Sequence, residues 1–357
     1  GRMTVAEVEE RMALIGGSTE YRDMAGVDVV IEAVFENVAL KKKVLESLDA
    51  VCKAGAIIAT NTSTLDVAEI ASSTGRPEDV VGLHFFSPAQ VMRLLEIVRT
   101  GNTADDVLAT SMQLAKKLRK VGVLSGNSYG FIGNRMMDPY GREAERLLLE
   151  GATPRRIDEV LQRFGMAMGI LAVYDMAGID VGYKVRQERK DRLPDDPSFY
   201  RASSMLVERG RLGQKTGAGF YRYEKGSRER HDNSEAIDMF VAEALRLGIK
   251  QRQISDEEIE QRCLFAMINE GAKVLEEGVA LRASDIDVVY TSGYGFPRYR
   301  GGPMFYADTV GLGEICARID AFAERLDPQY WQASSLLRTL ADSGESIANY
   351  VNNYVNH

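Results

Sequence analysis

Short apolar runs alternate with helical patterns along the first 125 residues, and this alternation restricts the fold more than any other feature of the sequence. The apolar, β-branched runs occupy residues 27–34, 56–60, 79–85, 94–99 and 120–126. Amphipathic patterns of helical period occupy residues 38–52, 66–73 and 104–118. Strands that alternate with helices of this length form βαβ units. The pattern predicts a mostly parallel sheet with helices on both faces and ligands beyond the carboxyl ends of the strands.

The character of the chain changes after Ser128. Strand patterns nearly vanish there and helical periodicity dominates, while the charged segment 223–236 has the composition of a connector. We therefore predict an α/β domain over residues 1–127, a first helical domain over 128–225 and a second helical repeat over 226–357.

The two helical domains share an ordered set of residues, which indicates an internal duplication. Eight residues of the first recur in the same order in the second with nearly the same spacing. The pairs are Glu143 and Glu270, Glu150 and Glu277, Gly151 and Gly278, Ile157 and Ile286, Asp158 and Asp287, Gly165 and Gly295, Asp175 and Asp308, and Gly178 and Gly311.

Composition excludes several classes of function. The net charge is −8 and no large basic cluster is present, so nothing points to a nucleic-acid partner. No apolar run has the length of a membrane span. The three cysteines lie far apart without metal-binding spacing, which fits a reducing compartment.

Four polar positions stand where the predicted sheet would bind a ligand. Ser63 lies in the cluster Asn-Thr-Ser-Thr after the run 56–60, and His84 ends the run 79–85. Glu96 interrupts the next apolar run, and a buried carboxylate needs a partner, for which His84 is the obvious candidate. Asn134 opens the first helical domain. The alternatives are that the 61–64 cluster and Asn134 are ordinary helix caps and that His84 is a core residue.

Other catalytic designs fit poorly. The chain has no Gly-x-Ser-x-Gly elbow for a serine hydrolase, and no second histidine or cysteine near His84 for a metal. The nearest match to a dinucleotide loop, GYGFPR at 293–298, lacks the third glycine and places a proline where a helix should begin, so we reject it.

Several longer stretches together resemble the L-3-hydroxyacyl-CoA dehydrogenase family. In the first part of the chain these are DVVIEAVFENVALKKKV (28–44), TNTSTLDVAEIA (60–71), GLHFFSPAQVMRLLEIV (82–98) and YGFIGNR (129–135). Farther along they are YDMAGIDVG (174–182), RLGQKTGAGFYRY (211–223), QRCLFAMINEGAKVLEEG (261–278) and GGPMFYADTVG (301–311). The second repeat and the form His-Phe-Phe-Ser-Pro are similar to the dehydrogenase part of type-1 multifunctional β-oxidation enzymes.

The resemblance implies oxidation of a 3-hydroxyacyl-CoA with NAD, and it implies roles for individual residues. His84 matches the catalytic base, Glu96 its carboxylate partner, Ser63 a contact to substrate and nicotinamide, and Asn134 a hydrogen-bond partner of the substrate. The positions that match cofactor contacts are Val34, Phe35, Glu36, Lys41, Ser63, Ser87 and Lys215. Ser87 stands where single-function members have asparagine. No metal is implied.

The sequence departs from the family in one large respect. It lacks the family's first βαβ unit, which contains the glycine-rich loop. A truncated Rossmann-type sheet followed by two duplicated helical domains is therefore expected. A protein limited to these residues is expected to bind NAD weakly, because that loop normally holds the pyrophosphate. Two alternatives remain: a binding or structural protein that kept the fold, and a different NAD-dependent hydroxyacid dehydrogenase.

The resemblance also implies partners and a location. An enoyl-CoA hydratase/isomerase domain is expected upstream on the full-length chain. The second helical repeat is expected to pack on the first as an intramolecular pseudo-dimer, which leaves the protein a monomer. The expected location is the cytoplasm, or the peroxisome in a eukaryotic source.

Overall fold

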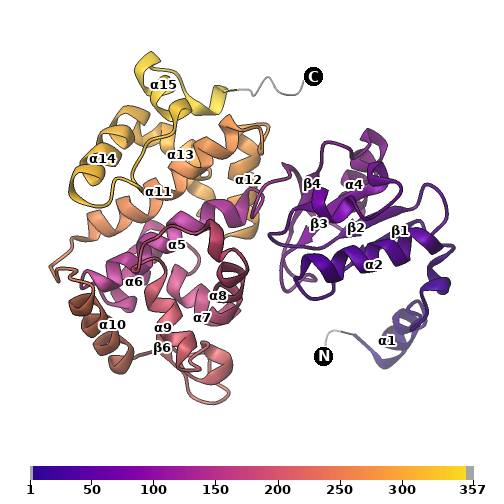
Figure 1. Cartoon of the computed structure of the whole chain (residues 1–357), viewed down its shortest axis with the longest axis horizontal. Coiled ribbons are helices and arrows are strands. Elements are labelled where there is room, and N and C mark those ends of the chain that lie inside the picture. The colour runs from indigo at the N-terminus through magenta and orange to yellow at the C-terminus, as the bar shows by residue number, and fades with distance from the viewer. Residues whose placement is uncertain (1–2, 351–357) are drawn as a thin grey trace. The chain divides into compact units, whose positions relative to one another are not determined.

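The computed structural model describes residues 3–350, whose backbone contacts form two compact units (Figure 1). The first unit contains the residues up to Phe85 together with Leu95–Gly122, and the second contains Phe86–Leu94 and the residues from Val123 onward. Among residues 3–350, no helix combines the length and apolar character needed to cross a membrane.

The first unit is built on a five-stranded sheet in the order β1-β2-β3-β4-β5. The strands are β1 (Val29–Glu32), β2 (Ile57–Thr60), β3 (Val80–Phe85), β4 (Leu94–Arg99) and β5 (Val121–Gly126), and β5 continues into the second unit. β1, β2 and β3 pair in parallel, whereas β3 and β4 pair antiparallel. All five strands expected from the apolar runs are present.

The first unit contains four α-helices among the described residues, and three of them have a side-chain cap at the N-terminus. They are α1 (Val5–Met12), α2 (Val38–Val51), α3 (Val67–Ala71) and α4 (Asp105–Lys117), with short 3₁₀ helices at Tyr21–Met24 and Pro77–Asp79. The Asn37 side chain accepts a hydrogen bond from Leu40 N at 2.9 Å and so caps α2. α2 buries Leu45 and Leu48 in a core cluster that also contains Ile58 of β2.

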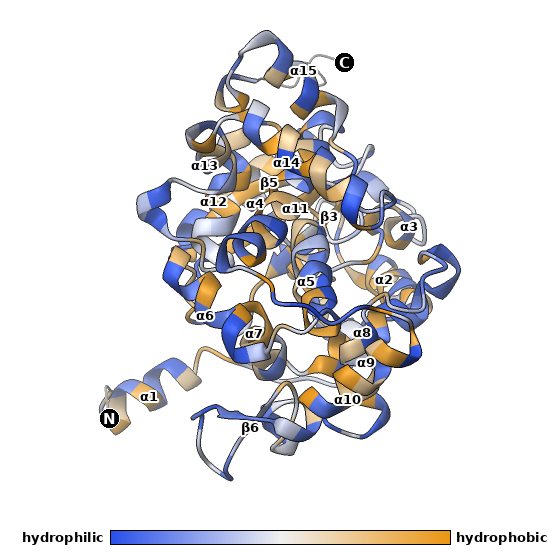
Figure 2. Ribbon diagram, turned by 90° about the vertical axis from the view of Figure 1, so that its left-hand side faces the viewer, coloured by the Kyte–Doolittle hydropathy of each residue, from blue (hydrophilic) through white to orange (hydrophobic). Residues whose placement is uncertain are grey.

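Helix α1 differs from the others because none of its residues is buried. A capping box between Thr4 and Glu7 supports its first turn. Figure 2 shows hydrophobic and hydrophilic residues interleaved along it. Its stability within the described residues therefore rests on local interactions.

The second unit is almost entirely helical. Its first repeat contains α5 (Gly133–Leu149), α6 (Pro154–Phe164), α7 (Ile170–Ala177), α8 (Ile179–Glu188) and α9 (Arg201–Glu208). Then follow a ribbon of β6 (Tyr221–Arg222) and β7 (His231–Asp232), and α10 (Ser234–Arg246). The second repeat contains α11 (Asp256–Glu276), α12 (Ala283–Gly293), α13 (Pro303–Val310), α14 (Leu312–Arg325) and α15 (Ser335–Ser343). Short 3₁₀ helices lie at Lys190–Arg192, Gln214–Thr216, Arg298–Arg300 and Ile347–Asn349.

The segment 223–236, expected to be a connector, is thus partly regular structure. His231 and Asp232 pair with β6, and the Asn233 side chain caps α10 while donating a hydrogen bond to Gly219 O at 2.8 Å. The charged composition of the segment gave no sign of this pairing because two-residue strands are too short to show a period.

Matching aspartates make matching contacts in the two repeats. Asp158 accepts hydrogen bonds from the Leu171 and Ala172 amides at the start of α7, at 3.0 and 2.9 Å. Asp287 accepts from the Met304 amide at the start of α13, at 2.8 Å. A carboxylate at a helix N-terminus satisfies amides that have no partner within the helix. The equivalence of these contacts supports the duplication seen in the sequence.

The second pair of matching aspartates, Asp175 and Asp308, also makes equivalent contacts. Asp175 accepts hydrogen bonds from the Phe220 and Tyr221 amides, both at 2.9 Å. Asp308 accepts from the Ile347 and Ala348 amides at 2.9 and 3.0 Å. In each repeat, an aspartate near the end of a helix therefore accepts hydrogen bonds from backbone amides of a later segment of the same repeat.

The two repeats meet through reciprocal ion pairs between α5 and α11. Arg262 of α11 binds Glu143 of α5 and Glu150, the residue after α5, with Nε and Nη1 each 2.9 Å from a carboxylate oxygen. Arg135 of α5 binds Glu270 of α11 and Glu277, the residue after α11, at 2.8 and 2.6 Å. Each repeat thus presents one arginine to two glutamates of the other, as the partners in a two-fold symmetric contact do.

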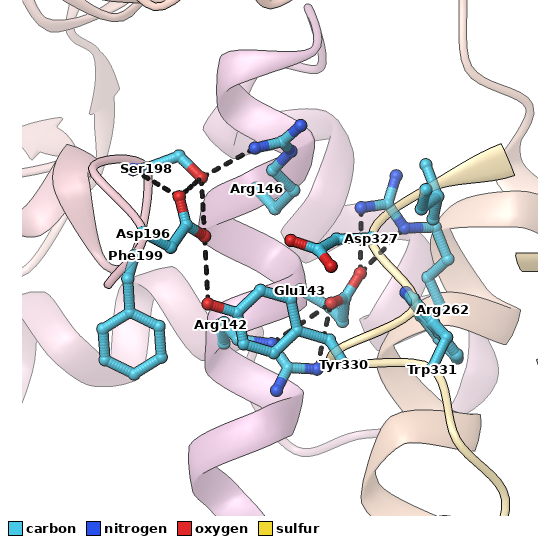
Figure 3. Close-up of a pocket in the computed structure, with 11 residues that line it drawn as sticks. Arg142, Glu143, Arg146, Asp196, Ser198, Phe199, Arg262, Asp327, Tyr330 and Trp331 are labelled. Carbon is cyan, nitrogen blue, oxygen red and sulfur yellow. Dashed lines mark hydrogen bonds and ion pairs between the residues drawn. The ribbon is translucent and has the colours of Figure 1, made fainter. Parts of the chain in front are cut away.

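The two halves of this contact differ in burial. Arg262 is fully buried, whereas the Arg135 side chain is 16% exposed. Burial opposes the charge of Arg262, but the carboxylates of Glu143 and Glu150 outweigh it and raise the pKa of its guanidinium. Figure 3 shows Arg262 and Glu143 joined beside a small cavity that Tyr330 and Trp331 also line.

A single hydrophobic core extends through both repeats. It contains Leu147 and Leu161 of the first repeat together with Leu264 and Met267 of the second, all at most 1% exposed. The second repeat therefore packs its apolar face on the first, as the sequence predicted.

Removing the buried arginine should destabilise the protein strongly. Arg262→Ala leaves the Glu143 and Glu150 carboxylates buried with one fewer cation, which we expect to cost about 3–5 kcal/mol of unfolding free energy. The measurement is urea denaturation of the full chain. Arg318→Ala, which removes the surface pair with Glu314 on α14, is the control and should leave the midpoint almost unchanged. Equal midpoints for the two variants would contradict the structural role of Arg262.

Candidate functional site

His84 and Glu96 form a buried pair across strands β3 and β4. The antiparallel register places the two residues directly opposite each other, and Nδ1 of His84 lies 2.7 Å from Oε2 of Glu96. His84 is 6% exposed and Glu96 is fully buried. The pairing expected from the sequence is confirmed. A carboxylate at Nδ1 fixes that nitrogen as the donor, so Nε2 is the nitrogen directed away from Glu96.

The close approach of the two strands depends on a glycine. Gly82 pairs with Val98, and a Cβ added to Gly82 would lie 2.6 Å from the Val98 Cβ. The neighbouring pair on one side of the dyad is Leu83 and Ile97, both fully buried, and the pair on the other side is the partly buried Phe85 and the buried Leu95. The dyad is therefore held by a tightly packed strand pair and not by a loop.

Ser63 lies in a loop that Glu36 organises. The Glu36 carboxylate accepts hydrogen bonds from Thr62 Oγ1 at 2.6 Å, from Ser63 N at 2.8 Å and from Ser63 Oγ at 3.3 Å. Burial opposes its ionisation, but the bonds from Thr62 and Ser63 and the charge of Lys41 outweigh this and lower the pKa of Glu36. Glu36, expected as a cofactor contact, thus also shapes the loop that carries Ser63.

The alternative that the 61–64 cluster caps the next helix is wrong. Helix α3 begins at Val67, and its capping side chain is Asp66, which accepts from Glu69 N at 3.1 Å. Thr62 Oγ1 instead accepts from Leu65 N at 3.0 Å and tightens the loop itself.

Lys41 is enclosed between two carboxylates. Its ammonium donates to both oxygens of Glu32, at 2.8 and 3.1 Å, and lies 3.4 Å from Glu36. Glu32 also accepts from Thr60 Oγ1 at 2.7 Å. The Lys41 side chain is 1% exposed, and its ammonium belongs to this cluster at the carboxyl ends of β1 and β2. A contact between Lys41 and a cofactor stays a prediction.

The remaining predicted cofactor residues fall into two groups. Val34 and Phe35 follow β1 directly and are 39% and 87% exposed, so they offer an open surface where the strand ends. Ser87 and Lys215 belong to the second unit, where the Lys215 ammonium forms an ion pair with Asp180.

Asn134 belongs to the second unit and does not act as a helix cap. It is the second residue of α5, whose N-terminal capping residue Ile132 makes no side-chain cap. The Asn134 Oδ1 accepts a hydrogen bond from the Tyr294 hydroxyl at 2.8 Å. Tyr294 follows α12 in the second repeat, so the amide is oriented by a residue far along the chain.

The sequence analysis assigned no role of their own to three polar residues that support the candidate site. Asn61 Oδ1 accepts from Phe85 N at 2.8 Å and ties the Ser63 loop to the end of β3. Thr62 and Glu32 complete the networks around Glu36 and Lys41. A carboxylate inside the apolar run 27–34, Glu32, was the one signal that could have been used, because a carboxylate buried in such a run needs a partner. Among residues 3–350, no cluster of histidine, cysteine or acidic side chains could hold a metal ion.

Two family models match the chain. A model described as 3-hydroxyacyl-CoA dehydrogenase, NAD binding domain, matches residues 1–128. A model described as 3-hydroxyacyl-CoA dehydrogenase, C-terminal domain, matches residues 130–223 and 259–350. The two segments matched by the second model lie in the two helical repeats.

Similar proteins carry related names. The peroxisomal bifunctional enzyme of Homo sapiens is 44% identical over 92% of this chain and 47% of its own length. The fatty acid oxidation complex subunit alpha of Pseudomonas putida is 36% identical over 98% of this chain and 49% of its own length. The chain therefore spans about half the length of these relatives.

Solved structures agree with the fold. The dehydrogenase part of multifunctional enzyme 1 from C. elegans is 32% identical, with a TM-score of 0.66 over 95% of this chain and 77% of that one. The 3-hydroxybutyryl-CoA dehydrogenase of Escherichia coli is 26% identical, with a TM-score of 0.79 over 97% of this chain and 88% of that one.

Loss of the Glu36 carboxylate should loosen the Ser63 loop. Glu36→Ala removes charge-assisted hydrogen bonds worth about 1.5–3 kcal/mol, so amide exchange at Ser63 and Thr64 should accelerate roughly 10- to 100-fold. Hydrogen–deuterium exchange measures this, with Glu69→Ala as a surface control.

The same experiment has a pH dependence. Because the folded pKa of Glu36 is lowered, the protection is fully present above the ordinary carboxyl pKa of 4.5 and is lost as the pH falls through the lowered value. Unchanged exchange at Ser63 in Glu36→Ala would show that another group holds the loop.

Proposed function

The chain belongs to the 3-hydroxyacyl-CoA dehydrogenase family, and from this membership we propose that it is the dehydrogenase part of a longer β-oxidation enzyme. The proposed reaction oxidises the 3-hydroxyl of an L-3-hydroxyacyl-CoA to a ketone, with NAD as the oxidant. The observation that carries the proposal is the buried pair of His84 and Glu96, because a histidine fixed by a carboxylate is a suitable general base.

The proposed base acts at the 3-hydroxyl. Nε2 of His84 accepts the hydroxyl proton while the hydride on C3 departs, so that the C3–O bond becomes a carbonyl. NAD, when bound, supplies the acceptor for that hydride. Glu96 holds the ring through the proton transfer, because its Oε2 lies 2.7 Å from Nδ1 and accepts a hydrogen bond from it.

Ser63 and Asn134 are the proposed hydrogen-bond partners of the reacting oxygen. Both residue types donate hydrogen bonds, and a donor that holds the oxygen in place fixes the direction of the departing hydride. The hydrogen bonds from the Ser63 loop to Glu36 and from Tyr294 to Asn134 support both assignments, because each limits the freedom of the donor.

For the cofactor, the exposed surface of Val34 and Phe35 at the carboxyl end of β1 suits a nucleotide. Glu36, Lys41, Ser63, Ser87 and Lys215 complete the proposed contacts through the family resemblance. We assign residues 1–127 to the NAD-binding domain, 128–225 to the first helical domain and 226–357 to the second helical repeat.

The longer protein is proposed to carry an enoyl-CoA hydratase/isomerase domain upstream of this chain. The relatives named as bifunctional or multifunctional, of which the chain covers about half, support this arrangement. The peroxisomal names of the animal and plant relatives support a peroxisomal location in a eukaryotic source. In a bacterial source we expect the cytoplasm.

Removal of the proposed base tests the reaction. In the full-length enzyme, His84→Ala should lower kcat for 3-hydroxyacyl-CoA oxidation by roughly 10²- to 10⁴-fold, the usual contribution of a general base. NADH absorbance follows the reaction. His231→Ala, a substitution of the histidine in β7, is the matched control and should retain activity. Near-normal turnover in His84→Ala would remove His84 from the mechanism.

The reciprocal contact of the two repeats supports a monomeric state for this region. A dimer contact supplied within one chain already covers the apolar face of the first repeat. Light scattering of the full-length protein should therefore give the mass of one chain at micromolar concentration. A stable dimer joined through the helices of the first repeat would contradict the proposal.

A further inference from the structure

The second helical repeat carries a residue that touches the candidate site. Its Tyr294 hydroxyl donates to Asn134 Oδ1 at 2.8 Å. We infer that Tyr294 is a positioning residue for Asn134, and this inference rests on the proposed function. A repeat without a catalytic dyad of its own would then contribute to the reaction through one hydroxyl.

The geometry selects one orientation of the amide. A phenol bound to Oδ1 directs that acceptor toward Tyr294, so the Nδ2 donor points in a different direction. An oxygen that gains negative character during proton removal needs a donor and is repelled by an acceptor. Tyr294 thereby favours the amide orientation that the proposed reaction requires.

The tyrosine ring is itself held firmly. It stacks on Tyr290 with centroids 4.9 Å apart and meets the edge of Phe86 at 5.4 Å. It also lies directly on α5, because a Cβ added to Gly133 would be 2.2 Å from the Tyr294 ring. Gly133 therefore has to be glycine for the ring to reach the residue that follows it, Asn134.

The two repeats differ at this position. Tyr294 directly precedes Gly295, and Phe164 directly precedes Gly165, the glycine that corresponds to it in the first repeat. Phe164 is 2% exposed and packs edge-on against Phe296 at 5.6 Å. Each repeat thus has an aromatic residue at this position. Only the one in the second repeat, Tyr294, carries the hydroxyl that reaches Asn134.

The test uses the full-length enzyme and compares two tyrosine-to-phenylalanine variants. Tyr294→Phe keeps the ring and removes the hydrogen bond, so kcat should fall roughly 3- to 10-fold, the usual effect of one neutral hydrogen bond. KM for NAD should stay at its wild-type value, and the unfolding midpoint should fall by no more than the loss of one neutral hydrogen bond explains. Tyr299→Phe, also in the second repeat, removes a hydroxyl that donates to Phe164 O at 2.9 Å; it is the matched control and should leave kcat unchanged.

A double variant separates the possible failures. In an Asn134→Ala background, Tyr294→Phe should cause no further loss, because its partner is gone. Loss of activity in Asn134→Ala with normal kcat in Tyr294→Phe would overturn the role of Tyr294 alone. An equal loss from Tyr294→Phe in both backgrounds would also overturn it. Wild-type turnover in Asn134→Ala would overturn the proposed role of Asn134 and with it that of Tyr294, whereas a wild-type enzyme without dehydrogenase activity would overturn the proposed function itself.

Discussion

The ion pair of Arg262 with Glu143 and Glu150 is the contact on which the helical unit depends. Transfer of three charged groups out of water costs free energy, and only close, well-aligned pairing offsets that cost. An apolar contact between two helices tolerates sliding, whereas a buried guanidinium between two carboxylates accepts one alignment. The pair therefore fixes the position of α11 along α5, and with it the position of α12 and the tyrosine that follows it.

Two buried carboxylates, Glu96 and Glu32, and the partly buried Glu36 also determine local geometry in the sheet unit. Glu96 fixes a ring, Glu36 fixes a loop, and Glu32 fixes the lysine between them in space. In each case an isolated charge would be unstable, so the carboxylate and its partner hold each other in a defined geometry. The antiparallel turn from β3 to β4 is what makes the first of these possible, because antiparallel strands place residue pairs directly opposite each other.

The sequence predicted the contacts that leave a periodic or local trace. The five strands follow from apolar runs, and the pairing of His84 with Glu96 follows from a single charge inside one of those runs. The contact between Asn134 and Tyr294 joins residues far apart in the chain and depends on how two helices cross, so no spacing could reveal it. The contact of Glu36 with the Ser63 loop could not be predicted either, since a carboxylate after a strand can face either a ligand or the neighbouring loop.

Because both repeats lie in one chain, corresponding positions of the two repeats can carry different residues. In a symmetric dimer one gene encodes both sides of the axis, so a substitution is made at both places at once. Phe164 and Tyr294 occupy corresponding places but are encoded separately. A hydroxyl added at both would also enter the first repeat, where the aromatic ring is almost fully buried and a polar group would need a new partner. Because the two positions are encoded separately, a hydroxyl can be present at position 294 while position 164 keeps its apolar ring.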